Sequence, residues 1–276
     1  MKLYRTKNGP AVIDDDGEMY LLPDLKWDSI LASDRPMEII RQTISGKQAQ
    51  AVSELGLIQA PVGTQEVWAA GVTYWRSREA RMEESKSAGG GDFYDRVYSA
   101  DRPELFFKSS GTKVVGHGAL VRIRKDSKWN VPEPELTLLI SASGKITGYT
   151  IGNDMSSRDI EGENPLYLPQ AKSYDGACAV GPCIWLTESP IAKETKIQIQ
   201  ISRKNVVMFS GETEVAQIKR ELPSLAEFLY RENSHPVGAF LLTGTGVVPP
   251  DSFTLQSGDE IAITIEPIGK LVNCVQ

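Results

Sequence analysis

The sequence has little of what many catalytic and binding sites require. It holds only two histidines, His117 and His235, and no His-Glu-x-x-His motif, which argues against a histidine-built zinc site. Its three cysteines, Cys178, Cys183 and Cys274, form no Cys-x-x-Cys pair, which excludes zinc ribbons and thioredoxin-type redox motifs. Scattered thiols in odd number suit a reducing compartment, so we expect a cytoplasmic protein.

Charge and hydropathy exclude two further classes. The 30 basic and 36 acidic residues give a net charge of −6, which argues against a nucleic-acid partner, because such proteins normally carry a basic face. No apolar run approaches the roughly 18 residues that a membrane span needs, and we expect neither a membrane segment nor a secretory signal. Any metal site must then be built from oxygen ligands.

The first sixty residues differ in pattern from the rest of the chain. Residues 1–23 have the composition of short strands joined by turns, and residues 24–58 carry apolar residues at helical spacing. Pro61-Val62-Gly63 then interrupts the helical pattern. We therefore predict a small N-terminal α/β domain over residues 1–62 and a catalytic domain over residues 63–276.

Strands dominate the predicted catalytic domain. Alternating or continuous apolar patterns predict strands at 67–72, 105–107, 120–123, 136–140, 145–151, 196–202 and 261–265. A helix is expected over 215–231, interrupted or restarted at Pro223, and a charged helical segment over 73–85 precedes Gly89-Gly90-Gly91. Because strands and helices do not alternate regularly, we predict an α+β fold that is predominantly β and mainly antiparallel.

Carboxylates cluster in two predicted strand segments. Glu133 and Glu135 stand two residues apart, and side chains at that spacing point to the same face of an extended chain. Asp154 ends a later strand and could complete an oxygen triad for Mg²⁺, Mn²⁺ or Ca²⁺. The same patterns also occur on solvated strands and at turns, so the spacing alone leaves both interpretations open.

Two further segments have the composition of binding or catalytic elements. Lys172 lies among small and apolar residues, where burial or a nearby metal would lower its pKa and let it act as a base; a surface lysine is the alternative. Leu242-Thr243-Gly244-Thr245-Gly246 is a glycine-rich turn whose backbone amides could bind a substrate carboxylate. It is not a phosphate-binding P-loop, because Gly-Lys-[Ser/Thr] is absent.

Taken in order, motifs along residues 65–273 resemble those of the fumarylacetoacetate hydrolase family. They are Pro-Glu-Pro-Glu-Leu at 132–136, Gly-Asn-Asp-Met-Ser-Ser-Arg-Asp at 152–159, Ala-Lys-Ser-Tyr-Asp at 171–175 and Leu-Thr-Gly-Thr-Gly at 242–246. The resemblance implies a mixed β-roll catalytic domain that assembles into homodimers or homotetramers. It also implies a divalent metal, usually Mg²⁺ with Mn²⁺ or Ca²⁺ as alternatives, held by Glu133, Glu135 and Asp154.

Family members act on small-molecule 2-oxo acids, and the branches differ in the residues that handle protons. The hydrolase branch has a Gly-x-Asn-Tyr-x-x-His segment, in which the histidine and a glutamate activate water. The matching segment here, residues 71–77, ends in Ser77, which cannot act as a base near neutral pH without an activator. Hydrolysis of a C–C bond in acylpyruvate- or fumarylpyruvate-type diketo acids is therefore the alternative activity, with His117 or a nearby glutamate as the base.

Other segments resemble the 2-keto-3-deoxy sugar-acid dehydratases of the same family, namely Pro103–Ser109, the Lys172 segment and Gly244–Pro250. The resemblance implies a Mg²⁺-dependent hydro-lyase that acts through a metal-stabilised enolate and converts, for example, 2-keto-3-deoxyarabinonate to 2,5-dioxopentanoate. In that interpretation Lys172 is the base and Glu104 the acid. The substrate contacts expected with them are Arg76, Ser109 and Thr245.

Overall fold

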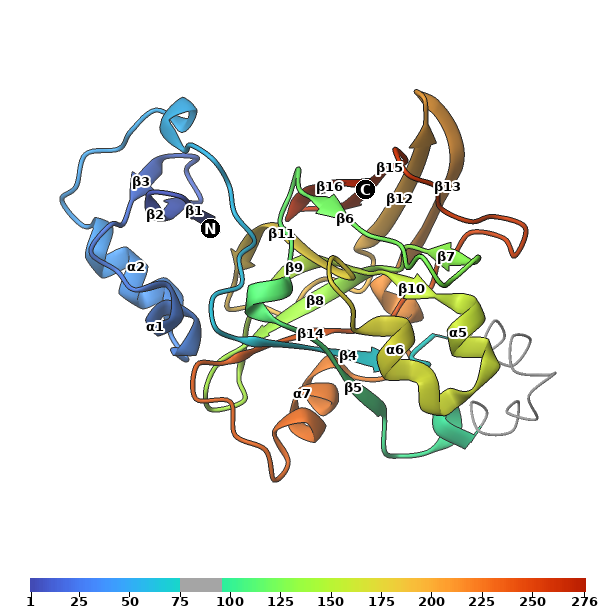
Figure 1. The fold of residues 1–276 in the computed structure, drawn as a ribbon. Helices are drawn as coiled ribbons and strands as arrows, with labels where there is room; N and C mark the ends of the chain where they lie inside the picture. Colours follow the sequence, from blue (N-terminus) through green and yellow to red (C-terminus); the bar gives the residue numbers. More distant parts are fainter. Residues whose placement is uncertain (75–95) are drawn as a thin grey trace.

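Two β-sheets form the framework of the protein in the computed structural model, which describes residues 1–74 and 96–276 (Figure 1). The larger sheet has nine strands in the order β3-β2-β1-β11-β9-β8-β14-β4-β5, and the smaller has five in the order β13-β12-β15-β16-β6. Most neighbours are antiparallel; the parallel pairs are β14 with β4 and β16 with β6. The predicted α+β, predominantly β, mainly antiparallel fold is confirmed.

The nine-stranded sheet draws its strands from the whole length of the chain. They are β1 (Lys2–Thr6), β2 (Gly9–Ile13), β3 (Met19–Leu21), β4 (Glu66–Gly71), β5 (Glu104–Ser110), β8 (Pro134–Ile140), β9 (Ile146–Asp154), β11 (Cys178–Leu186) and β14 (Ala239–Leu242). The central strands β8 and β9 are buried over almost their whole length, although both contain polar residues.

The smaller sheets and the helices surround this sheet. The five-stranded sheet contains β6 (Leu120–Val121), β12 (Lys196–Arg203), β13 (Val206–Glu214), β15 (Glu260–Ile265) and β16 (Gly269–Val275), and β7 (Asn130–Val131) pairs with β10 (Ser156–Ser157). The α-helices are α1 (Trp27–Ala32), α2 (Pro36–Ile44), α5 (Arg158–Glu163), α6 (Leu168–Lys172) and α7 (Leu222–Tyr230). Short 3-10 turns cover Val52–Glu54, Gly111–Lys113, Pro165–Tyr167 and Val215–Gln217.

Two hydrophobic cores pack on opposite faces of the large sheet. One lies between the two sheets and under α7, and includes Leu138, Ile199 and Ile263. The other joins the opposite face to α1 and α2, and includes Leu31, Leu139 and Leu242. Because side chains alternate along a strand, Glu135 of β8 shares the face of Leu139. At this end of β8, Arg158 of α5 and Lys172 of α6 contact the neighbouring Glu133. Helices α5 and α6 lie on the other side of the molecule from α1 and α2 (Figure 1).

The N-terminal residues continue the large sheet. Strand β1 pairs with β11 through Leu3 and Ile184, while α1 and α2 sit to one side of the molecule (Figure 1). Nothing in this arrangement tests the division into residues 1–62 and 63–276, which stays a prediction. Among the described residues, no helix is long and apolar enough to cross a membrane.

Candidate metal and proton-transfer site

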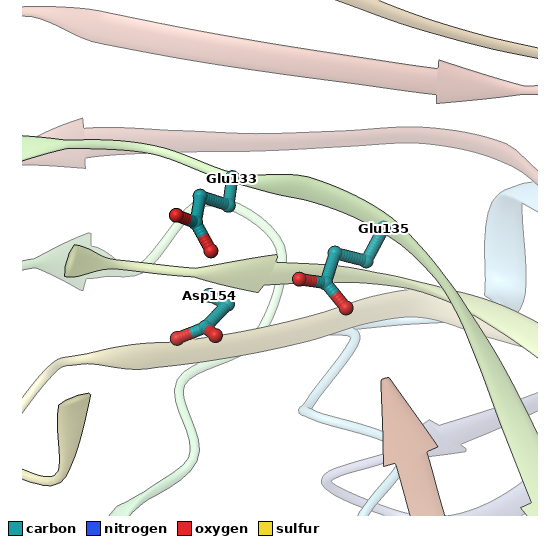
Figure 2. Close-up of side chains that lie close together, drawn as sticks. All are labelled: Glu133, Glu135 and Asp154. Atoms are coloured by element: carbon teal, nitrogen blue, oxygen red, sulfur yellow. The ribbon is translucent and has the colours of Figure 1, made fainter. Parts of the chain in front are cut away.

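Three carboxylates converge where β8 begins and β9 ends. The antiparallel register places Glu135 opposite Gly152, and the backbone amide of Asp154 donates to the Glu133 carbonyl at 3.0 Å. Side chains two residues apart on β8 share a face, and this register adds Asp154 to that face. Figure 2 shows the three carboxyl groups turned toward one another. One oxygen from each lies within 4.8 Å of the others.

Three cationic side chains surround these carboxylates. The Lys172 ammonium, which is fully buried, donates to Glu133 Oε2 at 2.6 Å and to Asp154 Oδ2 at 3.0 Å. It also contacts the hydroxyl of Ser156. The Arg158 guanidinium donates from Nη2 to Glu133 Oε1 at 2.8 Å. The predicted surface alternative for Lys172 is therefore wrong: the residue lies within the acidic cluster.

A second buried lysine, Lys108 of β5, contacts Asp154 from another side. Its Nζ lies 2.6 Å from Asp154 Oδ1 and donates to the Met155 carbonyl at 3.0 Å. A further hydrogen bond goes to the backbone carbonyl of Lys172. Among the described residues, the three carboxyl groups thus lie close to three basic side chains, those of Lys108, Arg158 and Lys172.

Glu135 is the carboxylate whose ionisation the fold opposes most clearly. Complete burial, followed by the nearby charges of Asp154 and Glu133, raises the pKa of the Glu135 carboxyl well above its ordinary range. Its Oε2 accepts a hydrogen bond from the Gly244 amide at 2.6 Å. Hard oxygen ligands in a group of three, two of them from adjacent strands, fit a divalent cation such as Mg²⁺. A cation among them would also relieve the repulsion that raises the pKa of Glu135.

A small cavity opens directly beside these residues. Its walls include Gly71 at the end of β4, Val72 after it, Phe106 of β5, and Gly244 with Thr245 after β14. Val72 has a positive φ of 52°, which is rare for a β-branched residue and is typical of functional sites. The glycine-rich turn predicted from the sequence therefore does border the site.

Glu104 lies next to Gly71, which lines this cavity, but Glu104 itself is not among the described lining residues. It pairs with Gly71 across β4 and β5, and a Cβ atom at Gly71 would fall 2.0 Å from Glu104 Oε2. The glycine thus leaves the space in which the carboxyl group sits. Phe106 of the same strand lines the cavity. Its neighbour Phe107 is 41% exposed and packs edge-on against Trp68.

The other predicted substrate contacts divide into three cases. Thr245 lines the cavity, although its hydroxyl donates to the Val247 carbonyl at 3.0 Å. Ser109 is buried, its hydroxyl donates to the Ser110 carbonyl, and it is not among the described residues that line the cavity. Arg76 lies outside the described residues, as do Ser77 and Gly89–Gly91.

Neither histidine reaches the cavity. His117 Nδ1 accepts a hydrogen bond from the Val272 amide at 3.2 Å. His235 lies 3.5 Å from the Glu66 carboxylate and packs against the rings of Trp68 and Tyr230. The water-activating role considered for His117 in the hydrolase alternative therefore has no support from its position.

The fold and the acidic cluster define the class of protein. Residues 71–276 match the family model described as fumarylacetoacetate (FAA) hydrolase C-terminal. The chain belongs to the fumarylacetoacetate hydrolase family.

Two curated relatives and one solved structure carry dehydratase names. A protein of Haloferax volcanii named probable 2-keto-3-deoxyxylonate dehydratase is 47% identical over 78% of this chain and 73% of its own. The 2-dehydro-3-deoxy-D-arabinonate dehydratase of Saccharolobus solfataricus is 36% identical over 100% of this chain and 96% of its own. A structure of 2-keto-3-deoxy-D-arabinonate dehydratase complexed with magnesium and 2,5-dioxopentanoate superposes with a TM-score of 0.85, at 33% identity, and covers 100% of this chain and 99% of its own.

Sequence reasoning missed three participants in the site. Lys108 and Arg158 lie within the motifs at 103–109 and 152–159, but neither motif predicted a role for them. The Gly244 amide was expected to bind substrate and instead binds Glu135. The signal that could have found Lys108 was a lone lysine between the apolar Phe106-Phe107 pair and two serines on a predicted strand.

Proposed function

We propose that this protein is a Mg²⁺-dependent hydro-lyase that removes water from a 2-keto-3-deoxy sugar acid. The observation that carries the proposal is the placement of the Lys172 ammonium on Glu133 and Asp154, inside a cavity that no histidine reaches. The relatives named as dehydratases, and the neighbour with magnesium and 2,5-dioxopentanoate, support the same substrate class. Five-carbon acids such as 2-keto-3-deoxyarabinonate are the first substrates to test.

Glu133, Glu135 and Asp154 would hold the metal. A divalent cation at these oxygens supplies Lewis-acid polarisation of a 2-oxo group and so acidifies the adjacent C3 proton. The chain's own task is then to remove that proton and to help the C4 hydroxyl depart. Both tasks need a base and an acid on separate elements, and α6 and β5 provide Lys172 and Glu104.

Lys172 is suited to take the C3 proton. A neutral amine accepts a hydrogen bond as well as donating two, and the Ser156 hydroxyl beside Nζ can act as donor or acceptor. The two carboxylates that Lys172 contacts in the described structure are the same ones assigned to the metal. Metal binding would therefore replace the ammonium as their counter-charge, and the neutral form would be the base.

Glu104 would complete the dehydration as the acid. It would deliver a proton to the C4 hydroxyl, which leaves as water while C3 and C4 become doubly bonded. The product of this step is a 3,4-unsaturated 2-oxo acid. In a five-carbon substrate, loss of a C5 proton and protonation of C3 then give a C4–C5 enol, which tautomerises to the 2,5-dioxo acid.

The proposal is tested by incubating the purified protein with Mg²⁺ and a 2-keto-3-deoxypentonate in the presence of an NAD(P)⁺-dependent semialdehyde dehydrogenase. We expect NAD(P)H formation that EDTA abolishes and that added Mg²⁺ restores. Acylpyruvate hydrolysis is followed in parallel. Cleavage of acylpyruvate without NAD(P)H formation would overturn the dehydratase assignment and favour the hydrolase alternative.

If Lys172 removes the C3 proton and Glu104 protonates the leaving hydroxyl, the first step should continue when the second is blocked. In Glu104→Gln, dehydration is expected to fall by about 100-fold or more, because the leaving hydroxyl loses its proton donor. Exchange of the C3 protons with deuterium oxide, measured by proton NMR, should continue because Lys172 is intact. Gly71→Ala should have a similar effect, since its Cβ would displace the Glu104 carboxyl. Loss of exchange together with dehydration in Glu104→Gln would contradict this division.

We further infer that the protein assembles into homodimers or homotetramers in the cytoplasm. Strand β13 is an edge of the five-stranded sheet, and its Val206, Val207 and Met208 side chains are 61%, 54% and 45% exposed. An apolar edge strand of this kind is normally covered. All three cysteines are free thiols, which supports a reducing compartment.

A further inference from the structure

We propose that Lys108 is a positioning residue that fixes the metal ligand Asp154 and the base Lys172 relative to each other. The role of Lys172 in this statement rests on the proposed function, whereas the contact with Asp154 does not. Lys108 would act without touching substrate, by holding two segments of the site that come from different parts of the chain.

A bulge in β5 directs Lys108 toward the site. Along the β4–β5 ladder, Trp68 pairs with Phe107 and Val67 with Ser109, so Lys108 is an extra residue with no partner in the register. Bulges of this kind re-aim a side chain and are frequent beside active sites. The side chain of Lys108 is fully buried there.

The Lys108 ammonium has three partners: it forms an ion pair with one carboxylate and donates hydrogen bonds to two backbone carbonyls. Two lie at the end of β9, where Nζ is 2.6 Å from Asp154 Oδ1 and donates to the Met155 carbonyl at 3.0 Å. The third is the backbone carbonyl of Lys172, the last residue of α6. One side chain of β5 therefore ties together the end of a strand and the end of a helix.

This arrangement divides the two oxygens of Asp154 between the two lysines. Oδ1 faces Lys108, and Oδ2 accepts a hydrogen bond from Lys172. A fixed cation on Oδ1 sets the rotation of the carboxylate and so aims Oδ2. The hydrogen bond to the Lys172 carbonyl sets the backbone from which the base extends. Small displacements of such groups are costly, because about 1 Å of misplacement can lower a rate roughly 100-fold.

A purely structural role is the competing explanation. Loss of one partner from a buried ion pair is strongly destabilising wherever the pair lies. The Arg203–Asp259 pair offers a matched control: Arg203 contacts Asp259 at 2.7 and 2.8 Å, and the Asp259 side chain is fully buried. Arg203 lies on β12 of the other sheet, and the described residues that line the cavity do not include it.

The experiment compares Lys108→Met, Lys108→Gln and Arg203→Met with the unmodified protein. Glutamine can still donate hydrogen bonds to the Met155 and Lys172 carbonyls but carries no charge. The glutamine variant therefore serves as the test if the methionine variant does not fold. For each protein, Mg²⁺ affinity is measured by calorimetry without substrate, the melting temperature by scanning calorimetry, and kcat and KM at saturating Mg²⁺.

Both Lys108 variants are expected to bind Mg²⁺ about 10- to 100-fold more weakly. They should also lose about 100-fold in kcat even when saturated with Mg²⁺, with little change in KM. Arg203→Met should lower the melting temperature and leave Mg²⁺ affinity and kcat unchanged. A Lys108→Gln protein with wild-type Mg²⁺ affinity, or with wild-type kcat at saturating Mg²⁺, would overturn the proposal. If the unmodified protein dehydrates no sugar acid, the proposed function fails. The Mg²⁺ affinities of the variants still test whether Lys108 orients the Asp154 carboxylate.

Discussion

Replacing Lys172 with alanine is expected to lower dehydratase turnover by at least 1,000-fold while Mg²⁺ binding is retained. General-base catalysis contributes about 10²- to 10⁴-fold, and Lys172 is the only lysine among the described cavity-lining residues. Its ammonium contacts Glu133 and Asp154, so its removal also takes away a competitor for the metal. Mg²⁺ affinity measured by calorimetry should therefore be unchanged or higher, and deuterium exchange at C3 of the substrate should cease.

Lys193→Ala is the control for this experiment. Lys193 lies on the surface, where it pairs with Glu221 at 3.6 Å, and exposed pairs contribute little to stability. Its turnover should match that of the unmodified protein. Turnover retained by Lys172→Ala would show that another group removes the proton. Loss of Mg²⁺ binding in Lys172→Ala would instead show that the lysine helps to build the metal site.

Glu135→Gln is expected to abolish Mg²⁺ binding and activity without destabilising the metal-free protein. Glutamine has nearly the same shape and keeps a carbonyl oxygen for the Gly244 amide, but it lacks the charge that attracts the cation. Mg²⁺ affinity should fall by at least about 100-fold. The rise in melting temperature that Mg²⁺ gives the unmodified protein should disappear.

The raised pKa of Glu135 fixes the sign of the stability change. An unperturbed glutamate has a pKa of about 4.3, and burial raises the folded-state value above it. The contribution of this group to stability is therefore fully present below the unfolded pKa and is lost as the pH rises through the folded one. At neutral pH, the metal-free Glu135→Gln protein should melt no lower than the unmodified chain, and its melting temperature should depend less on pH.

Glu227→Gln controls for the loss of a carboxylate as such. Glu227 is 68% exposed and pairs with Arg231 one helical turn away. It should bind Mg²⁺ and turn over substrate normally. A Glu135→Gln protein that still binds Mg²⁺ with wild-type affinity would contradict the assignment of the triad.

The sequence predicted those parts of the site that depend on the spacing of residues within one strand, but not those that depend on how strands pair. Glu133 and Glu135 were placed on one face because they stand two residues apart, and the structure confirms this. That Asp154 joins them depends on the register between β8 and β9, which local spacing does not specify. Lys108 was missed because its orientation depends on a bulge in the pairing with β4, and no pattern within β5 marks that bulge.

The fold was predicted best where the apolar pattern was strong. The strands at 136–140, 196–202 and 261–265 appear as β8, β12 and β15, and the helix expected from 215 to 231 restarts as α7 at Leu222 beside Pro223. Strand β13 was not predicted. In the structure it follows a two-residue hairpin turn, in which Lys204 and Asn205 both have positive φ. Its exposed residues show no simple alternation, because few of them face the core.

Carbon NMR of the reaction products tests the central claim most directly. A 2-keto-3-deoxypentonate labelled with ¹³C is incubated with the Mg²⁺-loaded protein, and the spectrum is compared with that of a sample containing EDTA. We predict a single five-carbon product in which C2 and C5 are both carbonyl carbons, with the C1–C5 chain intact and no product in EDTA. Fragments from a broken C–C bond, or an unchanged substrate in the presence of Mg²⁺, would contradict the account.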